Sequence, residues 1–158
     1  MTHHLLHVST DFLQHTENII FIRNPAQIIA SYSQVIPNVS LHDTGIEYQQ
    51  NLFNHLTKNN WPCIVIDSGE LLKNPKQMLK ELCAKMDIEF CDEMLHWPAG
   101  AKKEDGVWAK YWYANVHKTT GFQLQQTSSR LLPKHLEPLY LESKKYYDNL
   151  FQYSLKAE

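Results

Sequence analysis

The chain has few of the residues that mark secreted, membrane or fibrous proteins. Its 158 residues include only three cysteines and five glycines, and no two cysteines have Cys-x-x-Cys spacing. An odd number of scattered cysteines argues against a disulfide framework and favours buried free thiols in a reducing cytosol. No run approaches the ~18 consecutive apolar residues of a membrane span, and no basic-then-apolar signal sequence opens the chain. We therefore expect a soluble, cytoplasmic protein with no membrane partner.

Neither sign of charge is in large excess. Fifteen basic and seventeen acidic residues give a net charge of -2, which predicts no general affinity for nucleic acid. The 43% hydrophobic and 20% charged residues are ordinary for a folded soluble protein. Repeats, low-complexity tracts and Gly/Ser linkers are all missing from the sequence, so we expect one domain spanning residues 1–158.

The hydrophobic pattern predicts an α/β fold with a parallel sheet flanked by helices. Residues 18–23 and 63–66 are short apolar runs rich in β-branched side chains, typical of strands buried on both faces. The helical periodicity of 44–59 between them predicts a crossover, and therefore a parallel pair. Further helices are expected over about 5–15, 25–34, from Pro75 onward and over 133–153, with a loop at 37–43.

The most informative segment surrounds the end of the first strand. Arg23 follows the apolar run, Pro25 opens the next helix, and Ser31 comes eight positions after the arginine. An arginine at the carboxyl end of a parallel strand lies at the edge where open α/β sheets bind ligands. Its guanidinium suits a phosphate, and a serine hydroxyl adds a further donor. The alternative is an ordinary strand–turn–helix unit in which Arg23 pairs with a surface carboxylate and Ser31 packs.

This segment closely resembles the 3′-phosphate-binding element of the sulfotransferase superfamily, whose donor is 3′-phosphoadenosine 5′-phosphosulfate. The resemblance implies a P-loop NTPase-like sulfotransferase fold in which Arg23 and Ser31 hold the 3′-phosphate of the donor. It implies adenosine 3′,5′-bisphosphate as the product and requires no metal. The segment from Asp67 to Pro75 also resembles the family, although a loop and a helix cap explain each of its residues.

A basic loop late in the chain resembles the loop that closes over the donor nucleotide in this family. Lys102, Lys103, Gly106 and Trp108 supply cations, a flexible backbone position and an indole that can stack on a purine. The sequence departs here from the Arg-Lys-Gly opening usual in sulfotransferases. A solvated lysine loop with Trp108 in the core is the alternative.

Two histidines near the start of the chain are candidates for a general base. By resemblance to the Lys-x-His-Leu segment of cytosolic sulfotransferases, His3 or His4 would take the proton of the acceptor hydroxyl. Imidazole suits this role because its unperturbed pKa of ~6.5 makes it a competent base at neutral pH. The alternatives are a metal pair, since His3 and His7 have i, i+4 spacing, and a terminus without function.

The sequence also lacks the phosphate-binding loop that opens the family domain. No GxxxxGK[ST] motif or Gly-Ser/Thr cradle occurs in the 158 residues. We therefore expect an N-terminally truncated sulfotransferase fold, corresponding to the C-terminal part of the family domain. Its function would be sulfuryl transfer to a small hydroxyl or amine acceptor, with little turnover by this chain alone. The alternatives are a non-catalytic bisphosphate-binding remnant and a small α/β interaction domain.

Without the strand that carries that loop, one edge of the sheet is expected to be apolar. An unpaired apolar edge promotes pairing with another chain. The sequence thus predicts self-association through this edge.

Overall fold

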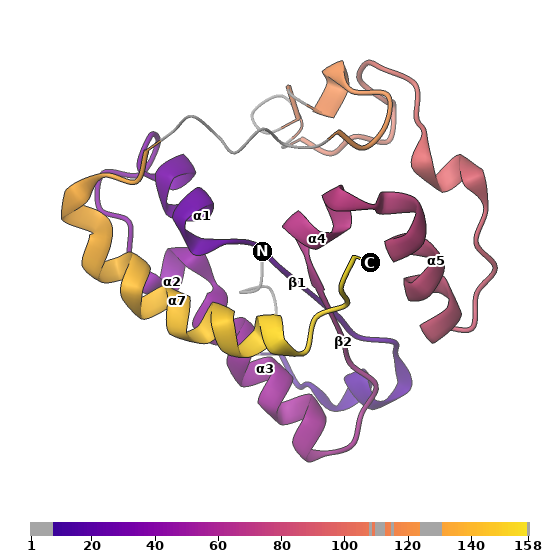
Figure 1. Ribbon diagram of the computed structural model, residues 1–158, viewed down its shortest axis with the longest axis horizontal. Coiled ribbons are helices and arrows are strands. Elements are labelled where there is room, and N and C mark those ends of the chain that lie inside the picture. Colours follow the sequence, from indigo (N-terminus) through magenta and orange to yellow (C-terminus); the bar gives the residue numbers. More distant parts are fainter. Residues whose placement is uncertain (1–7, 108, 110–112, 115, 124–130, 158) are drawn as a thin grey trace.

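Two short parallel strands form the centre of the computed structural model, which describes residues 8–107, 109, 113–114, 116–123 and 131–157. Strand β1 is Ile19–Ile22 and strand β2 is Ile64–Asp67. They pair in parallel, with Ile19 opposite Ile64 and Ile22 opposite Asp67. Their carboxyl ends therefore lie together (Figure 1). The α/β class and the parallel pair predicted from the sequence are confirmed.

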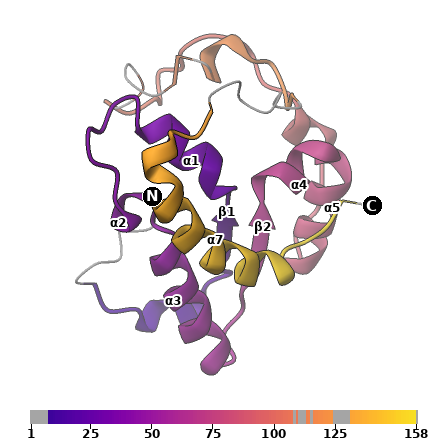
Figure 2. The same ribbon diagram turned by 60° about the vertical axis from the view of Figure 1, so that its left-hand side comes forward.

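Six α-helices are described around these strands. They are α1 (Pro25–Tyr32), α2 (Leu41–Thr44), α3 (Ile46–Lys58), α4 (Ser68–Lys73), α5 (Pro75–Lys85) and α7 (Glu137–Gln152). Short 3-10 turns are η2 (Asp11–His15), η3 (Asp92–Leu95), η4 (Val116–Lys118) and η5 (Lys134–Leu136). Figures 1 and 2 show α7 lying along α1 and α3 on one side of the strands, and α4 and α5 on the other.

Capping chemistry explains the starts of α1 and α5. Asn24 Oδ1 accepts a hydrogen bond from Ala26 N at 2.9 Å, and Pro25 occupies the first turn of α1. Asn74 Oδ1 likewise accepts from Gln77 N at 3.3 Å before Pro75 and α5. In both places the side chain satisfies a backbone donor that the helix cannot, and proline loses nothing where no donor is needed.

Alternation along the strands divides the core into two parts. Ile20, Ile22 and Val65 pack on one face of the pair against α3 and α7. Ile64 and Ile66 pack on the other face against Met78 of α5. Burying each such side chain contributes roughly 1.5–3 kcal/mol, so the two faces together fix the strand register.

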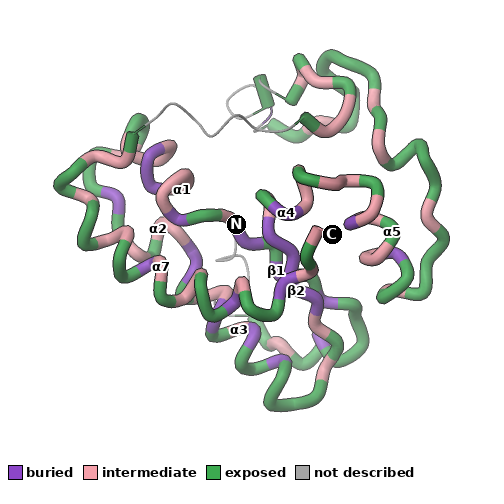
Figure 3. The backbone as a smooth tube through the Cα atoms, viewed as in Figure 1, coloured by how far each residue is buried: buried purple, intermediate pink, exposed green. Residues whose placement is uncertain are grey.

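The prediction that β1 is buried on both faces is wrong. Ile19 is 42% exposed and Phe21 is 50% exposed, whereas all four residues of β2 are buried (Figure 3). The register places Ile19 and Phe21 on the same face as Ile64 and Ile66. Helix α5 covers that face over β2, but the described residues do not bury it over β1.

Three further sequence predictions are corrected. The helix expected over about 5–15 is a 3-10 turn at Asp11–His15 within the described part of that range, and the loop expected at 37–43 ends in helix α2. Capping starts α2 early, since Ser40 and the carboxylate of Asp43 form a capping box. The three cysteines are free as expected, but they are not all buried, because Cys91 is exposed.

The C-terminal residues extend the sheet on the side of β2 away from β1. Ser154 forms an isolated parallel bridge with Val65, and Leu155 N donates to Val65 O at 3.0 Å. Strand β2 is therefore covered along both edges, while β1 has β2 as its one strand partner among the described residues. This asymmetry leaves β1 as the edge strand.

Candidate functional site

Arg23 directly follows β1, where the predicted phosphate site lies. Because Ile22 is opposite Asp67, the next residue along the chain emerges at the carboxyl edge, beside the start of α4. Arg23 is half-buried, and its Nε donates to Gln27 Oε1 at 2.9 Å. Gln27 lies one turn into α1, so the helix that follows the strand orients the guanidinium.

The electrostatic surroundings of Arg23 combine burial with one nearby carboxylate. Burial lowers the pKa of the Arg23 guanidinium from its ordinary value, and the charge of Asp67 opposes that shift. An arginine nevertheless stays protonated at neutral pH. A half-buried cation of this kind gains more from an anionic ligand than a fully solvated one does, because water screens it less.

Asp67 organises the same edge of the sheet, and sequence analysis assigned it no role beyond a helix cap. The residue is 4% exposed. Its Oδ1 accepts from Gly69 N and Glu70 N at 2.8 and 3.0 Å, which caps α4. Its Oδ2 accepts from the Tyr147 hydroxyl at 3.0 Å.

Tyr147 is the part of this arrangement that the sequence pattern did not reveal. Its ring lies on α7, eighty residues beyond Asp67, and stacks on Phe151 with ring centroids 5.5 Å apart. Burial and the charge of Asp67 raise the pKa of the Tyr147 hydroxyl, so this group stays a donor. The sequence predicted this helix, but a helical pattern does not indicate which residue a tyrosine hydroxyl will bond.

Ser31 lies on α1, two turns after Pro25, and is half-buried. In the same helix Ile29 is fully buried, and Ile28 and Tyr32 are half-buried. Arg23 and Ser31 are thus carried by one strand–helix unit, whose inner face is fixed by Ile29.

The predicted nucleotide-closing loop lies on the side toward which both strands point. Figures 1 and 2 show the described residues of 101–107 and 116–123 on that side of the molecule, beyond α1 and α4. Lys102 and Lys103 are exposed. Gly106 is also exposed, and an added Cβ there would meet nothing within 4 Å. Trp108, like His3 and His4, lies outside the described residues.

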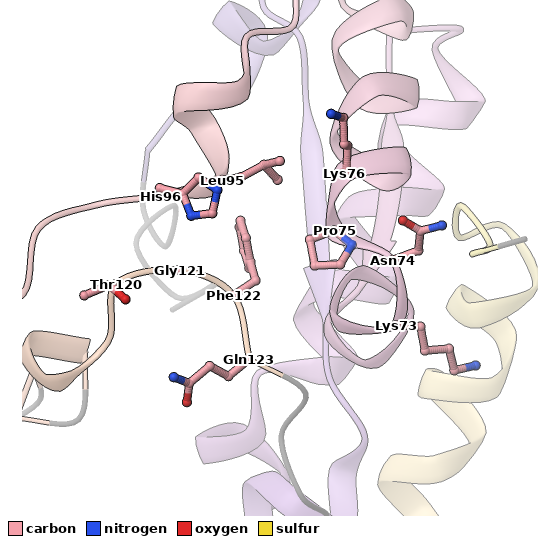
Figure 4. A pocket seen from close by; sticks show the side chains of 10 residues that line it. All are labelled: Lys73, Asn74, Pro75, Lys76, Leu95, His96, Thr120, Gly121, Phe122 and Gln123. Atoms are coloured by element: carbon pink, nitrogen blue, oxygen red, sulfur yellow. The ribbon is translucent and has the colours of Figure 1, made fainter.

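A cavity of about 420 Å³ opens at the start of α5, and its lining does not include Arg23 (Figure 4). Pro75, Leu95 and Phe122 line it together with His96. Lys73 and Lys76 also belong to its lining, but Lys73 pairs with Glu70 at 2.6 Å and Lys76 with Asp92 at 2.8 Å. Since neighbouring carboxylates offset both ammonium groups, this cavity is a poor site for a phosphate.

The described residues contain neither a metal-binding cluster nor a membrane-spanning helix. Three or more His, Cys, Asp or Glu side chains placed to hold a metal ion were not found in that part of the chain. Within the same residues, no helix has the length and apolar character that crossing a membrane requires.

Comparisons with known proteins identify the family and the fold. The family described as Sulfotransferase domain matches residues 1–135. The solved structure of a sulfotransferase domain from the curacin biosynthetic pathway superimposes with a TM-score of 0.51 over 88% of this chain and 54% of that one. At 16% identity this likeness concerns the fold alone.

Two curated relatives from Arabidopsis thaliana match over 129 residues. They are branched-chain-amino-acid aminotransferase-like protein 2, at 34% identity, and branched-chain-amino-acid aminotransferase-like protein 1, at 35%. Each alignment covers 82% of this chain but 23% of the relative. The chain therefore spans about a quarter of the length of these relatives. The family match over residues 1–135 and the shared fold lead to one conclusion: this chain belongs to the sulfotransferase family.

Proposed function

We propose that this chain binds the 3′-phosphate half of 3′-phosphoadenosine 5′-phosphosulfate in a sulfuryl transfer to a hydroxyl or amine acceptor. The observation that carries the proposal is the position of Arg23. Its guanidinium is half-buried at the carboxyl edge of a parallel pair, held by Gln27 at 2.9 Å. A guanidinium group held at this edge can donate two parallel hydrogen bonds to a dianionic phosphate.

The other residues have roles in keeping with their positions. Ser31, on the helix that orients Arg23, adds a hydroxyl donor for the same phosphate. Lys102 and Lys103, with Gly106 and Trp108 nearby in sequence, would close over the nucleotide from the side where the strands end. His3 or His4 would take the proton from the hydroxyl group of the molecule that receives the sulfuryl group. No metal is needed, because cations and backbone dipoles stabilise the charge that develops on the transferring oxygens.

The 158 residues contain no Gly-rich phosphate cradle for the transferring group. Because electrostatic stabilisation is usually the largest catalytic contribution and a histidine base supplies only about 10²–10⁴-fold, a base cannot replace it. This supports a second candidate function for the chain on its own: a bisphosphate-binding domain without turnover.

Calorimetry on the wild-type chain tests the proposal. Adenosine 3′,5′-bisphosphate should bind more tightly than adenosine 5′-monophosphate by about 10- to 150-fold, the equivalent of roughly 1.5–3 kcal/mol for hydrogen bonds to a charged group. Equal affinities would reject the site.

A parallel incubation with radiolabelled sulfuryl donor and a panel of phenols, sugars and amines distinguishes the two functions. Transfer supports the enzyme, and bisphosphate binding without transfer supports the binding domain.

A further inference from the structure

A second cavity, of about 340 Å³, lies between residues 97–106 and 113–117. Its lining does not include Arg23, Ser31 or the residues that cap α4 and α5. The volume is at the small end of the range for ligand sites, which is about 300–1,000 Å³. The cavity also holds a paired histidine and aspartate.

Aromatic and apolar side chains form the walls of this cavity. Trp97 is fixed in place, since its Nε1 donates to Thr119 Oγ1 at 3.0 Å and its ring meets Phe122 edge-on at 5.3 Å. Tyr113 is a second aromatic residue of the lining, and its ring meets the His117 ring edge-on with centroids 6.1 Å apart. Pro98 and Val116 complete the apolar lining. Fixed flat surfaces of this kind favour a planar ring.

The polar part of the cavity is the pair formed by Asp105 and His117. Asp105 Oδ2 is 2.8 Å from His117 Nε2 and accepts from Lys102 N at 2.8 Å. That backbone donor, with His117, lowers the pKa of the Asp105 carboxyl, so it is ionised at neutral pH. The side chains of Asp105 and His117 are 20% and 23% exposed, so the pair is shielded but reachable.

The aspartate determines what the histidine can offer a ligand. An ionised carboxylate only accepts, so the Nε2 atom of His117 that faces it carries a proton. In the neutral imidazole ring Nδ1 then keeps its lone pair and acts as an acceptor. Nothing in the described part of the chain donates to that atom. A partner for Nδ1 must therefore bring its own O–H or N–H.

We propose that this cavity binds a small ligand made of an aromatic ring that bears a hydrogen-bond donor. The ring lies between Trp97 and Tyr113, and the donor bonds to Nδ1 of His117. The Lys102 side chain at the lining adds a positive charge that favours the electron-rich face of an aromatic ring. A carboxylate is a poorer ligand, because it offers no donor to Nδ1. The cavity shares Lys102 with the loop that the proposed function places over the nucleotide, but it does not include Arg23 or Ser31, and its test uses no nucleotide.

Paired probes that differ in one proton test the inference. Binding of 2-naphthol and of 2-methoxynaphthalene to the wild-type chain is measured by nuclear magnetic resonance, following the indole signal of Trp97. The naphthol should bind about 2- to 12-fold more tightly, the equivalent of roughly 0.5–1.5 kcal/mol for one neutral hydrogen bond. In His117→Phe the ratio should fall to about one. The exposed His135 supplies the control, since His135→Phe should keep the wild-type ratio.

The ratio is taken between two ligands on one sample, so partial unfolding of a variant does not produce it. Where His117→Phe does not fold, the ring nitrogens of His117 in the wild-type chain give the answer. Nε2 should carry the proton, and the Nδ1 signal should shift on adding 2-naphthol but not its methyl ether. A ratio near one in the wild type, an unchanged ratio in His117→Phe, a proton on Nδ1, or no saturable binding would each overturn the proposal.

Discussion

At the scale of single residues, Asp67 connects the sheet edge, a helix start and the C-terminal helix. Its two carboxylate oxygens accept from the backbone of α4 and from the Tyr147 hydroxyl. Gly69 is required for this arrangement, since a Cβ there would lie 2.9 Å from Asp67 Oδ1. The position of Arg23 could be predicted from the sequence because strand, proline and helix follow one another locally. The contact with Tyr147 could not, because nothing in a helical stripe specifies a partner eighty residues away.

Removing the Tyr147 hydroxyl should destabilise the fold. In Tyr147→Phe one oxygen of the buried Asp67 loses its donor, which costs roughly 1–3 kcal/mol of the free energy of unfolding. Urea denaturation followed by circular dichroism measures the loss. Tyr146→Phe is the matched control, because the Tyr146 hydroxyl donates to the exposed Glu47 at 3.1 Å. Equal effects of the two substitutions would contradict the role given to Asp67.

Cys63 should make stability depend on pH in the alkaline range. Burial raises the pKa of Cys63 to about 11 from its ordinary value of 9.0. The folded state therefore favours the neutral thiol. That contribution is fully present below about pH 9 and is lost as the pH rises through about 11. The difference in unfolding free energy between wild type and Cys63→Ala should shrink between about pH 9 and 11. A difference that does not change with pH would contradict this role of the Cys63 thiol.

At the scale of elements, β1 differs from β2 in what covers it. The outer edge of β1 carries the backbone groups of Ile19 and Phe21, and Gln49 Nε2 donates to Phe21 O at 2.8 Å. Neither lysine nor proline protects this edge within Ile19–Ile22. Sequence patterns predicted both strands, because β-branched runs are local. They did not predict the exposed face of β1, since the extent of α5 is set by tertiary packing.

We propose that this edge pairs with the same edge of a second copy. Sedimentation of the wild-type chain should show association that rises with concentration. Phe21→Lys should shift it toward the monomer, because an inserted charge disfavours pairing of two identical edges. Val35→Lys is the control, as Val35 is 64% exposed but lies beyond α1. Association that is absent in the wild type, or unaffected by Phe21→Lys, would refute the proposal.

At the scale of the whole molecule, the chain matches 54% of a solved sulfotransferase domain and 23% of each curated relative. The fold class, the parallel pair and the place of Arg23 were all accessible from sequence, because each depends on a short segment. The loop at 101–123 was not, since it has no periodicity and is held by contacts such as Asp105 with His117. The roles of His3, His4 and Trp108 remain predictions.

The central claim is that Arg23 contacts the 3′-phosphate of the donor, and a double-mutant cycle measures that contact alone. Calorimetry gives the affinities of wild type and Arg23→Ala for adenosine 3′,5′-bisphosphate and for adenosine 5′-monophosphate. Lys85→Ala, a surface lysine 3.9 Å from Glu81, serves as the charge control. We expect a coupling energy of roughly 1.5–3 kcal/mol between Arg23 and the 3′-phosphate, and none with Lys85. A coupling energy near zero for Arg23 would contradict the proposed function.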